Sequence, residues 1–292
     1  MDASVGYLTA ELVEAGTGTP FPMSVMYPTT ASSAPQRLGP FSLDLAIGAE
    51  PLPGKYPLVV VSHGSGGSPL THRLLARHLA ANGVVVGLPE HPGNNRNDNA
   101  LADTIEILER RPGHLATAAD WFFGGSPFAG SLTPGSYAVV GHSLGGYTAL
   151  ALAGGVPSTL PRETGDDPAQ RIEVAPDPRV SALVLLAPAT PWFSLPGALA
   201  AVRTPILLLA GEKDEICPTP WMPRVVVDGV PAGTPVEYRV VDDAGHFSFL
   251  SPWPEAMTSP AFPPSQDPPG FDRHRFMGEL NDTVLGFLRE RT

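Results

Sequence analysis

A serine flanked by glycines is the residue of this chain best suited to covalent chemistry. Ser143 stands in Gly-His-Ser-Leu-Gly at 141–145, between an apolar run at 137–140 and a helix-forming run at 147–152. A strand, a sharp turn and a helix in this order form a nucleophile elbow, in which side chains in place of the two glycines would collide with the neighbouring strand and helix. The helix N-terminus also favours negative charge that develops beside the serine. This context predicts that Ser143 is a nucleophile rather than an ordinary turn residue.

A serine hydroxyl is a poor nucleophile at neutral pH and needs a base, which a carboxylate must orient. His246 comes shortly after the last expected strand, 236–241, and we expect it to take the proton of Ser143 and pass it to the leaving group. Asp214 follows the preceding strand, 205–210, and is the expected partner of His246. Four further acids in the same two loops are alternatives to Asp214: Glu212, Glu215, Asp242 and Asp243.

An oxyanion intermediate needs two backbone N–H donors that are already in place. Leu144, directly after the nucleophile, is expected to supply one of them, and Ser65 the other from Ser-His-Gly-Ser-Gly-Gly at 62–67. The alternative interpretation of this stretch is a flexible glycine-rich turn. It lacks the Gly-Lys-Ser/Thr of a phosphate loop and the glycine spacing of a dinucleotide loop.

Three further side chains near these motifs could take part in chemistry. We expect His142 to pack beside the site as a substrate contact rather than to transfer protons. We expect His63 to orient the loop after its strand, since no cluster of partner ligands suggests a metal site. Cys217 is expected to be a packed thiol rather than a second nucleophile.

The segments that would position these residues alternate between strand and helix patterns. Continuous apolar runs predict buried strands at 58–61, 84–88, 137–140, 180–186 and 205–210, and the last strand is expected at 236–241. An antiparallel edge is expected from strands at 5–13 and 21–27, with a further candidate at 41–47. Helices are expected at 70–81, at 102–123 with an interruption at 112–113, at 147–152, and from Asp272 onward. The fold class is therefore α/β, with a mostly parallel sheet flanked by helices and catalytic groups at the carboxyl ends of its strands.

Composition limits the kind of protein and its partners. We expect residues 1–292 to form one domain, with a proline-rich loop insertion at about 251–270. The net charge of 18 − 29 = −11 argues against nucleic acid and anionic membranes as partners. No stretch is apolar enough to span a bilayer, and the first twenty residues hold no apolar run, so we expect no signal peptide and a cytoplasmic protein.

Four motifs together resemble a known family. They are residues 62–67, Pro-Glu-His-Pro-Gly-Asn at 89–94, Arg111-Pro112, and Gly-His-Ser-Leu-Gly-Gly at 141–146. They resemble the dienelactone-hydrolase-like branch of the α/β-hydrolases, which includes the platelet-activating-factor acetylhydrolases. The chain order Ser143, Asp214, His246 is also the order of that fold.

A second resemblance concerns the substrate site. Ala-Thr-Pro-Trp at 189–192 and Gly-Glu-Lys-Asp at 211–214 are similar to bacterial cutinases and polyester hydrolases. The resemblance implies that Trp192 forms one wall of the acyl site, with Phe193 beside it as a further candidate contact. The alternative for Trp192 is packing in the core. Dienelactone hydrolases use a cysteine nucleophile, whereas this chain has Ser143.

Together these features predict a serine hydrolase that cleaves carboxylic esters and needs neither cofactor nor metal. The expected substrate is a small-molecule or lipid-like ester. The same acyl-enzyme would also permit amide hydrolysis or acyl transfer. A binding protein that keeps the scaffold without the chemistry is the alternative from another class.

Overall fold

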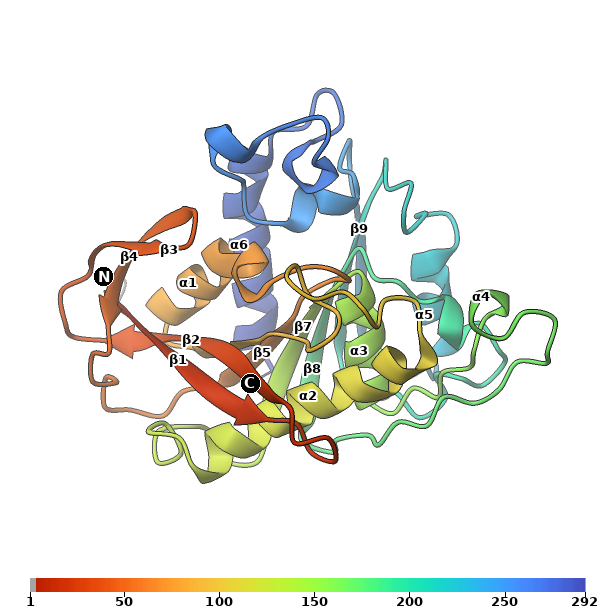
Figure 1. The fold of residues 1–292 in the computed structure, drawn as a ribbon, viewed down its shortest axis with the longest axis horizontal. Helices are drawn as coiled ribbons and strands as arrows, with labels where there is room; N and C mark the ends of the chain where they lie inside the picture. The colour runs from red at the N-terminus through yellow and green to blue at the C-terminus, as the bar shows by residue number, and fades with distance from the viewer. Residues whose placement is uncertain (1–3, 292) are drawn as a thin grey trace.

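A ten-stranded mixed sheet organises the computed structural model, which describes residues 4–291 (Figure 1). Its strand order is β10-β9-β8-β7-β5-β6-β2-β1-β4-β3. The strands of the first half of the chain are β1 (Ser4–Val13), β2 (Pro20–Thr29), β3 (Ala34–Leu38), β4 (Phe41–Ile47), β5 (Leu58–Ser62) and β6 (Val85–Pro89). The later strands are β7 (Tyr137–His142), β8 (Val180–Leu186), β9 (Ile206–Gly211) and β10 (Val236–Val241). All neighbours from β6 to β10 pair in parallel, whereas β2 pairs antiparallel with both β1 and β6.

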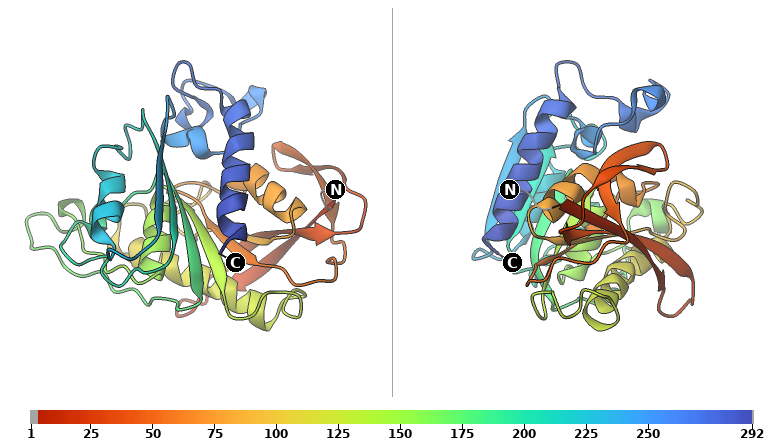
Figure 2. Two further views of the ribbon diagram at one scale, coloured as in Figure 1. Left: turned by 180° about the vertical axis from the view of Figure 1, so that it is seen from behind. Right: turned by 90° about the vertical axis from the view of Figure 1, so that its left-hand side faces the viewer.

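Helices cover both faces of the sheet (Figure 2). One face carries α1 (Arg73–Ala81) and α6 (Arg273–Arg289), which contact each other. The other carries α2 (Ile105–Gly124), α3 (Leu144–Leu152) and α5 (Met222–Gly229). The short elements are α4 (Pro161–Thr164), η1 (Pro69–His72), η2 (Pro191–Phe193), η3 (His246–Phe249), η4 (Glu255–Met257) and η5 (Pro263–Ser265). In the part of the chain that the structure describes, no helix combines the length and apolarity needed to cross a membrane.

The central strands are apolar on both faces because each face is buried under a helical layer. Successive side chains of a strand point to opposite faces, so Val59 packs in the same cluster as Leu280 of α6, and Val60 in the same cluster as Leu115 of α2. This explains why these strands read as continuous apolar runs rather than as alternating patterns. The mostly parallel α/β fold predicted from the sequence is confirmed.

Pro112 does not interrupt α2, so the expected break at 112–113 is wrong. The helix runs from Ile105 to Gly124 through the proline. A proline has no N–H to donate to the carbonyl four residues earlier, here that of Leu108. The hydroxyl of Tyr147 in α3 donates to this carbonyl at 3.0 Å. A side chain of the neighbouring helix therefore satisfies the carbonyl that the proline leaves free.

Two elements had no counterpart in the sequence-based expectations. β3 is a mostly polar edge strand with a proline, and its hydrogen-bonding partner is β4 alone. α5 follows a proline-containing turn and carries Pro223 in its own first turn. Residues 251–270 are irregular apart from η4 and η5, as predicted for this proline-rich segment.

Candidate active site

Ser143 lies at the sharp turn between β7 and α3, with φ 53° and ψ −121°. This positive φ is strained for a residue with a side chain, and the two flanking glycines make the turn possible. A Cβ on Gly141 would lie 2.2 Å from the carbonyl oxygen of Gly145, and a Cβ on Gly145 would lie 2.0 Å from that of Ser62. The collisions expected from the sequence are therefore present, and they involve backbone atoms of α3 and β5.

We expect Gly145→Ala to lower the free energy of unfolding by about 3 kcal/mol, because β5 or α3 must shift to admit the methyl group. Gly113→Ala in α2 is the matched control, since a Cβ there meets nothing within 4 Å. It should be neutral or stabilising by roughly 0.5–1 kcal/mol. Urea unfolding of both variants measures the difference, and equal midpoints would contradict the close packing inferred at the elbow.

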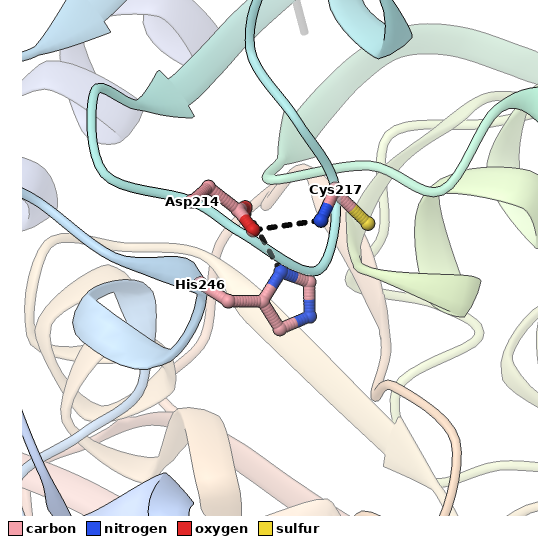
Figure 3. Close-up of side chains that lie close together, drawn as sticks. All are labelled: Asp214, Cys217 and His246. Atoms are coloured by element: carbon pink, nitrogen blue, oxygen red, sulfur yellow. Dashed lines mark hydrogen bonds and ion pairs between the residues drawn. The ribbon is translucent and has the colours of Figure 1, made fainter.

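Asp214 and His246 form a buried pair at the carboxyl ends of β9 and β10 (Figure 3). His246 Nδ1 lies 2.9 Å from Asp214 Oδ2. The other carboxylate oxygen, Oδ1, accepts from the backbone N–H groups of Ile216 at 2.9 Å and Cys217 at 2.7 Å. Of the five acids considered from the sequence, Asp214 is the one in contact with His246. This geometry is suited to holding the imidazole with Nδ1 protonated and Nε2 free to accept a proton.

Two cavities meet at Ser143. The larger, of about 520 Å³, is lined by Ser143, His246 and His142, together with residues of the 64–68 loop and of the proline-rich segment. The smaller, of about 170 Å³, is lined by Ser143, Leu144, Trp192 and Cys217, among others. Ser65 and Ile216 line both cavities. An ester bound at Ser143 would therefore have separate spaces for its acyl and alcohol parts.

Ser65 and Leu144, the expected oxyanion donors, both line the smaller cavity with Ser143. Ser65 follows β5 in a turn closed by Gly67 N donating to Gly64 O at 3.1 Å. Leu144 is the first residue of α3, so its N–H has no acceptor within the helix. Within residues 4–291, no turn or loop carbonyl accepts from either amide. Both N–H groups are thus free for a ligand.

The three candidate substrate contacts occupy different places. Trp192 is 3% exposed, packs on Tyr147 with ring centroids 5.0 Å apart, and also lines the smaller cavity. His142 lines the larger cavity, and its Nε2 lies 3.0 Å from the carbonyl oxygen of His246. Phe193 is buried and lines a separate depression with residues 194–199 and α5, not either cavity at Ser143. The structure therefore brings Trp192 and His142 to the nucleophile but not Phe193.

Cys217 lies beside the Asp214–His246 pair and touches the nucleophile. Burial, and then the charge of Asp214, raise the pKa of the Cys217 thiol to about 12. A hydrogen bond with the Ser143 side chain acts in the opposite direction and lowers this pKa, but by less. Ligand atoms of Asp214, Cys217 and His246 lie within 4.8 Å of one another, a spacing that could hold a metal ion (Figure 3). A thiol with so high a pKa is a poor ligand, however, and both carboxylate oxygens already accept hydrogen bonds. The donor set therefore suits proton transfer better than metal binding.

A buried arginine that sequence reasoning gave no role connects the elements of the site. Arg111 of α2 donates to Thr148 Oγ1 in α3 at 3.0 Å, to Asn94 Oδ1 at 2.6 Å and to Ser62 Oγ at 3.2 Å. Asn94 in turn donates to Ser65 Oγ at 2.9 Å. Burial lowers the pKa of Arg111 to about 9, which leaves it charged at neutral pH. The motifs around Asn94 and Arg111 were the only sequence signal for this network.

Buried histidines give the protein a predicted sensitivity to acid. Burial lowers the pKa of His63 to about 3 and those of His72 and His114 to about 4, against about 6.5 for an unfolded chain. Their contribution to stability is complete above pH 6.5 and is lost as the pH falls from there toward 4, because the unfolded state takes up protons first. We expect a loss of about 1.4 kcal/mol per histidine per pH unit in this window. Urea unfolding between pH 7 and pH 4.5 measures this loss of stability, and an unfolding midpoint that stays constant over this range would contradict the prediction.

The arrangement of sheet and helices is the α/β-hydrolase fold. Residues 40–109 match the family described as platelet-activating factor acetylhydrolase, isoform II. A bis(hydroxyethyl) terephthalate hydrolase of Streptomyces coelicolor is 28% identical over 145 residues, a stretch that is 50% of this chain and only 39% of that relative. These similarities confirm the resemblance to the acetylhydrolase branch and to polyester hydrolases that the motifs indicated.

Solved structures with the same fold cover essentially the whole chain. A ferulic acid esterase from Streptomyces cinnamoneus aligns with TM-score 0.70 and 19% identity over 100% of this chain and 91% of its own. A dienelactone hydrolase from Anabaena variabilis aligns with TM-score 0.60 and 16% identity over 99% of both chains. At such identities the likeness shows the fold and leaves the substrate to be argued from the site.

Proposed function

We propose that the chain is a serine hydrolase that cleaves carboxylic esters through an acyl-enzyme on Ser143. The observation that carries the proposal is the buried Asp214–His246 pair, with His246 lining the same cavity as a serine held at positive φ. His246 acts as base toward Ser143 and then as acid toward the leaving alcohol, while Asp214 fixes its tautomer. The amides of Ser65 and Leu144 bind the oxyanion.

The relatives support esters as the bond type. The Streptomyces coelicolor relative is a bis(hydroxyethyl) terephthalate hydrolase, and the structural neighbour from Streptomyces cinnamoneus is a ferulic acid esterase. Both are named for esters of aromatic acids. The smaller cavity is lined by Trp192, Leu144 and Met222 and has room for a compact apolar group, since a cavity of about 150 Å³ holds a benzene molecule.

Labelling by a fluorophosphonate probe tests the proposal directly. The probe reacts with an activated serine, so peptide mapping should place the label on Ser143. Absence of label on folded protein would favour a non-catalytic binding protein on this scaffold. Product analysis with added alcohols or amines distinguishes hydrolysis from acyl transfer, because only an acyltransferase would deliver the acyl group to them in preference to water.

A further inference from the structure

The position of His246 indicates which cavity receives which part of the ester. As general acid, the imidazole must reach the oxygen of the leaving alcohol. His246 lines the larger cavity, whereas the described residues that line the smaller cavity do not include it. The alcohol part therefore lies in the larger cavity, and the acyl part in the smaller cavity beside Trp192.

The two cavities differ in charge. Among the described residues that line the larger cavity, Arg96 carries the only permanent charge. The smaller cavity contains Arg162, which is neutralised by Glu163 at 2.7 Å and faces Asp103 at 3.9 Å. Arg96, in contrast, has no carboxylate partner within residues 4–291. In a protein of net charge −11, an arginine without a counter-ion in a cavity next to the nucleophile is a site for an anion.

Arg96 is held in place at both ends. Its backbone N–H donates to Gly67 O at 2.7 Å, which ties it to the loop that carries Ser65. Its guanidinium carbon lies 5.6 Å from the ring centroid of Trp253 and 5.4 Å from that of Phe262. These cation–π contacts hold the guanidinium against an aromatic wall formed by the two rings, whose centroids are 4.8 Å apart. The two rings meet at 79°, so the cavity presents an aromatic corner next to a planar cation.

The proline-rich segment that supplies this wall is fixed to the body of the protein. Arg73 of α1 donates to the carbonyl of Pro252, and Ser251 N donates to Thr71 O at 2.9 Å. At its other end Arg273 of α6 donates to Pro264 O at 2.8 Å. Both arginines are buried. The wall is therefore already formed before a ligand arrives, which lowers the entropic cost of binding.

We propose that the larger cavity binds an alcohol part that carries a carboxylate on a flat apolar body, with the carboxylate on Arg96 and the flat body in the corner between Trp253 and Phe262, its face on one ring and its edge on the other. The substrate class is then an ester of a compact acid with a carboxylated, aromatic-type alcohol. A single guanidinium matches the single charge of a carboxylate rather than the double charge of a phosphate monoester. This proposal rests on the proposed ester hydrolase function, because the assignment of the cavities depends on His246 acting as general acid.

Two matched esters test the proposal in kinetics. 4-Carboxyphenyl butyrate and 4-carbamoylphenyl butyrate have nearly the same shape but differ in charge. We expect Arg96→Gln to lower the ratio of their kcat/KM values, charged over neutral, by about tenfold, the effect of losing one charge-assisted hydrogen bond. Comparing ratios between proteins cancels the different intrinsic reactivities of the two phenols. Arg203→Gln is the control, because it removes the same charge from a residue that is exposed like Arg96 but lines neither cavity.

A binding measurement separates this proposal from the catalytic one. Calorimetry on the Ser143→Ala protein should show tighter binding of 4-hydroxybenzoate than of 4-hydroxybenzamide, and Arg96→Gln in the same background should remove the preference. This readout needs no chemistry, so it stands even if Ser143 proves not to be the nucleophile. Equal binding of the two compounds, or a kinetic ratio that changes no more in Arg96→Gln than in Arg203→Gln, would overturn the proposal. The proposal would also be overturned if Arg96→Gln lowered kcat/KM only for p-nitrophenyl hydrogen succinate, which carries its carboxylate on the acyl side.

Discussion

Replacing Ser143 with alanine is expected to lower the turnover of short-chain p-nitrophenyl esters by about 10⁶-fold, as removal of the nucleophile does in other serine hydrolases. The substitution removes the atom that forms the acyl-enzyme, and neither neighbouring group can replace it. The Nδ1 of His246 is bound to Asp214, and the Cys217 thiol has a pKa of about 12, so it is protonated at neutral pH. A residual rate above that in water would reflect the free amides of Ser65 and Leu144, which still bind an oxyanion.

Initial rates on p-nitrophenyl acetate and butyrate measure this loss, with circular dichroism to confirm that the variant is folded. Ser42→Ala is the matched control, because Ser42 is an exposed residue of β4 at the far edge of the sheet from β9 and β10. It should leave turnover unchanged. Hydrolysis by Ser143→Ala at the unsubstituted rate would reject Ser143 as nucleophile and with it the proposed mechanism.

The parts of the fold that could be read from the sequence are those whose signal is local. β8 and β10 have the boundaries expected from the sequence. The elbow at Ser143 was predictable because strand, glycines and helix are consecutive in the chain. Asp214 and His246 were predictable because both follow strands of a parallel sheet, whose carboxyl ends meet at one edge.

The parts that escaped prediction depend on contacts between distant segments. Arg111 is fully buried, which is unusual for arginine and possible only because Asn94, Thr148 and Ser62 come from three other elements. The contact of Arg96 with Trp253 and Phe262 likewise joins two loops that nothing in the sequence pairs. Polar contacts of this kind have no periodicity, so only the folded chain reveals them.

Asp214→Asn is the variant with the second-largest expected effect, a loss of about 10⁴-fold in kcat. The reason lies in how the loop after β9 holds the side chain. Asp214 Oδ1 accepts from the backbone N–H groups of Ile216 and Cys217, which would hold the oxygen of an asparagine in the same place. The asparagine NH₂ group would then face His246 Nδ1, where Oδ2 now lies at 2.9 Å. A donor there favours the tautomer with the proton on Nε2, and that nitrogen can no longer accept the proton of Ser143.

The control for this variant is Asp243→Asn in the loop after β10. Asp243 was an alternative partner for His246, but in the structure it pairs with Lys213 and is half exposed. Its substitution removes the same charge from the same edge of the sheet and should change kcat by less than about twofold, as an exposed ion pair contributes little. If Asp214→Asn and Asp243→Asn proved equally active on p-nitrophenyl butyrate, orientation of His246 by Asp214 would be excluded. A large loss in Asp214→Asn alone, at unchanged thermal stability, would show that the carboxylate acts on the tautomer of His246 rather than on the fold.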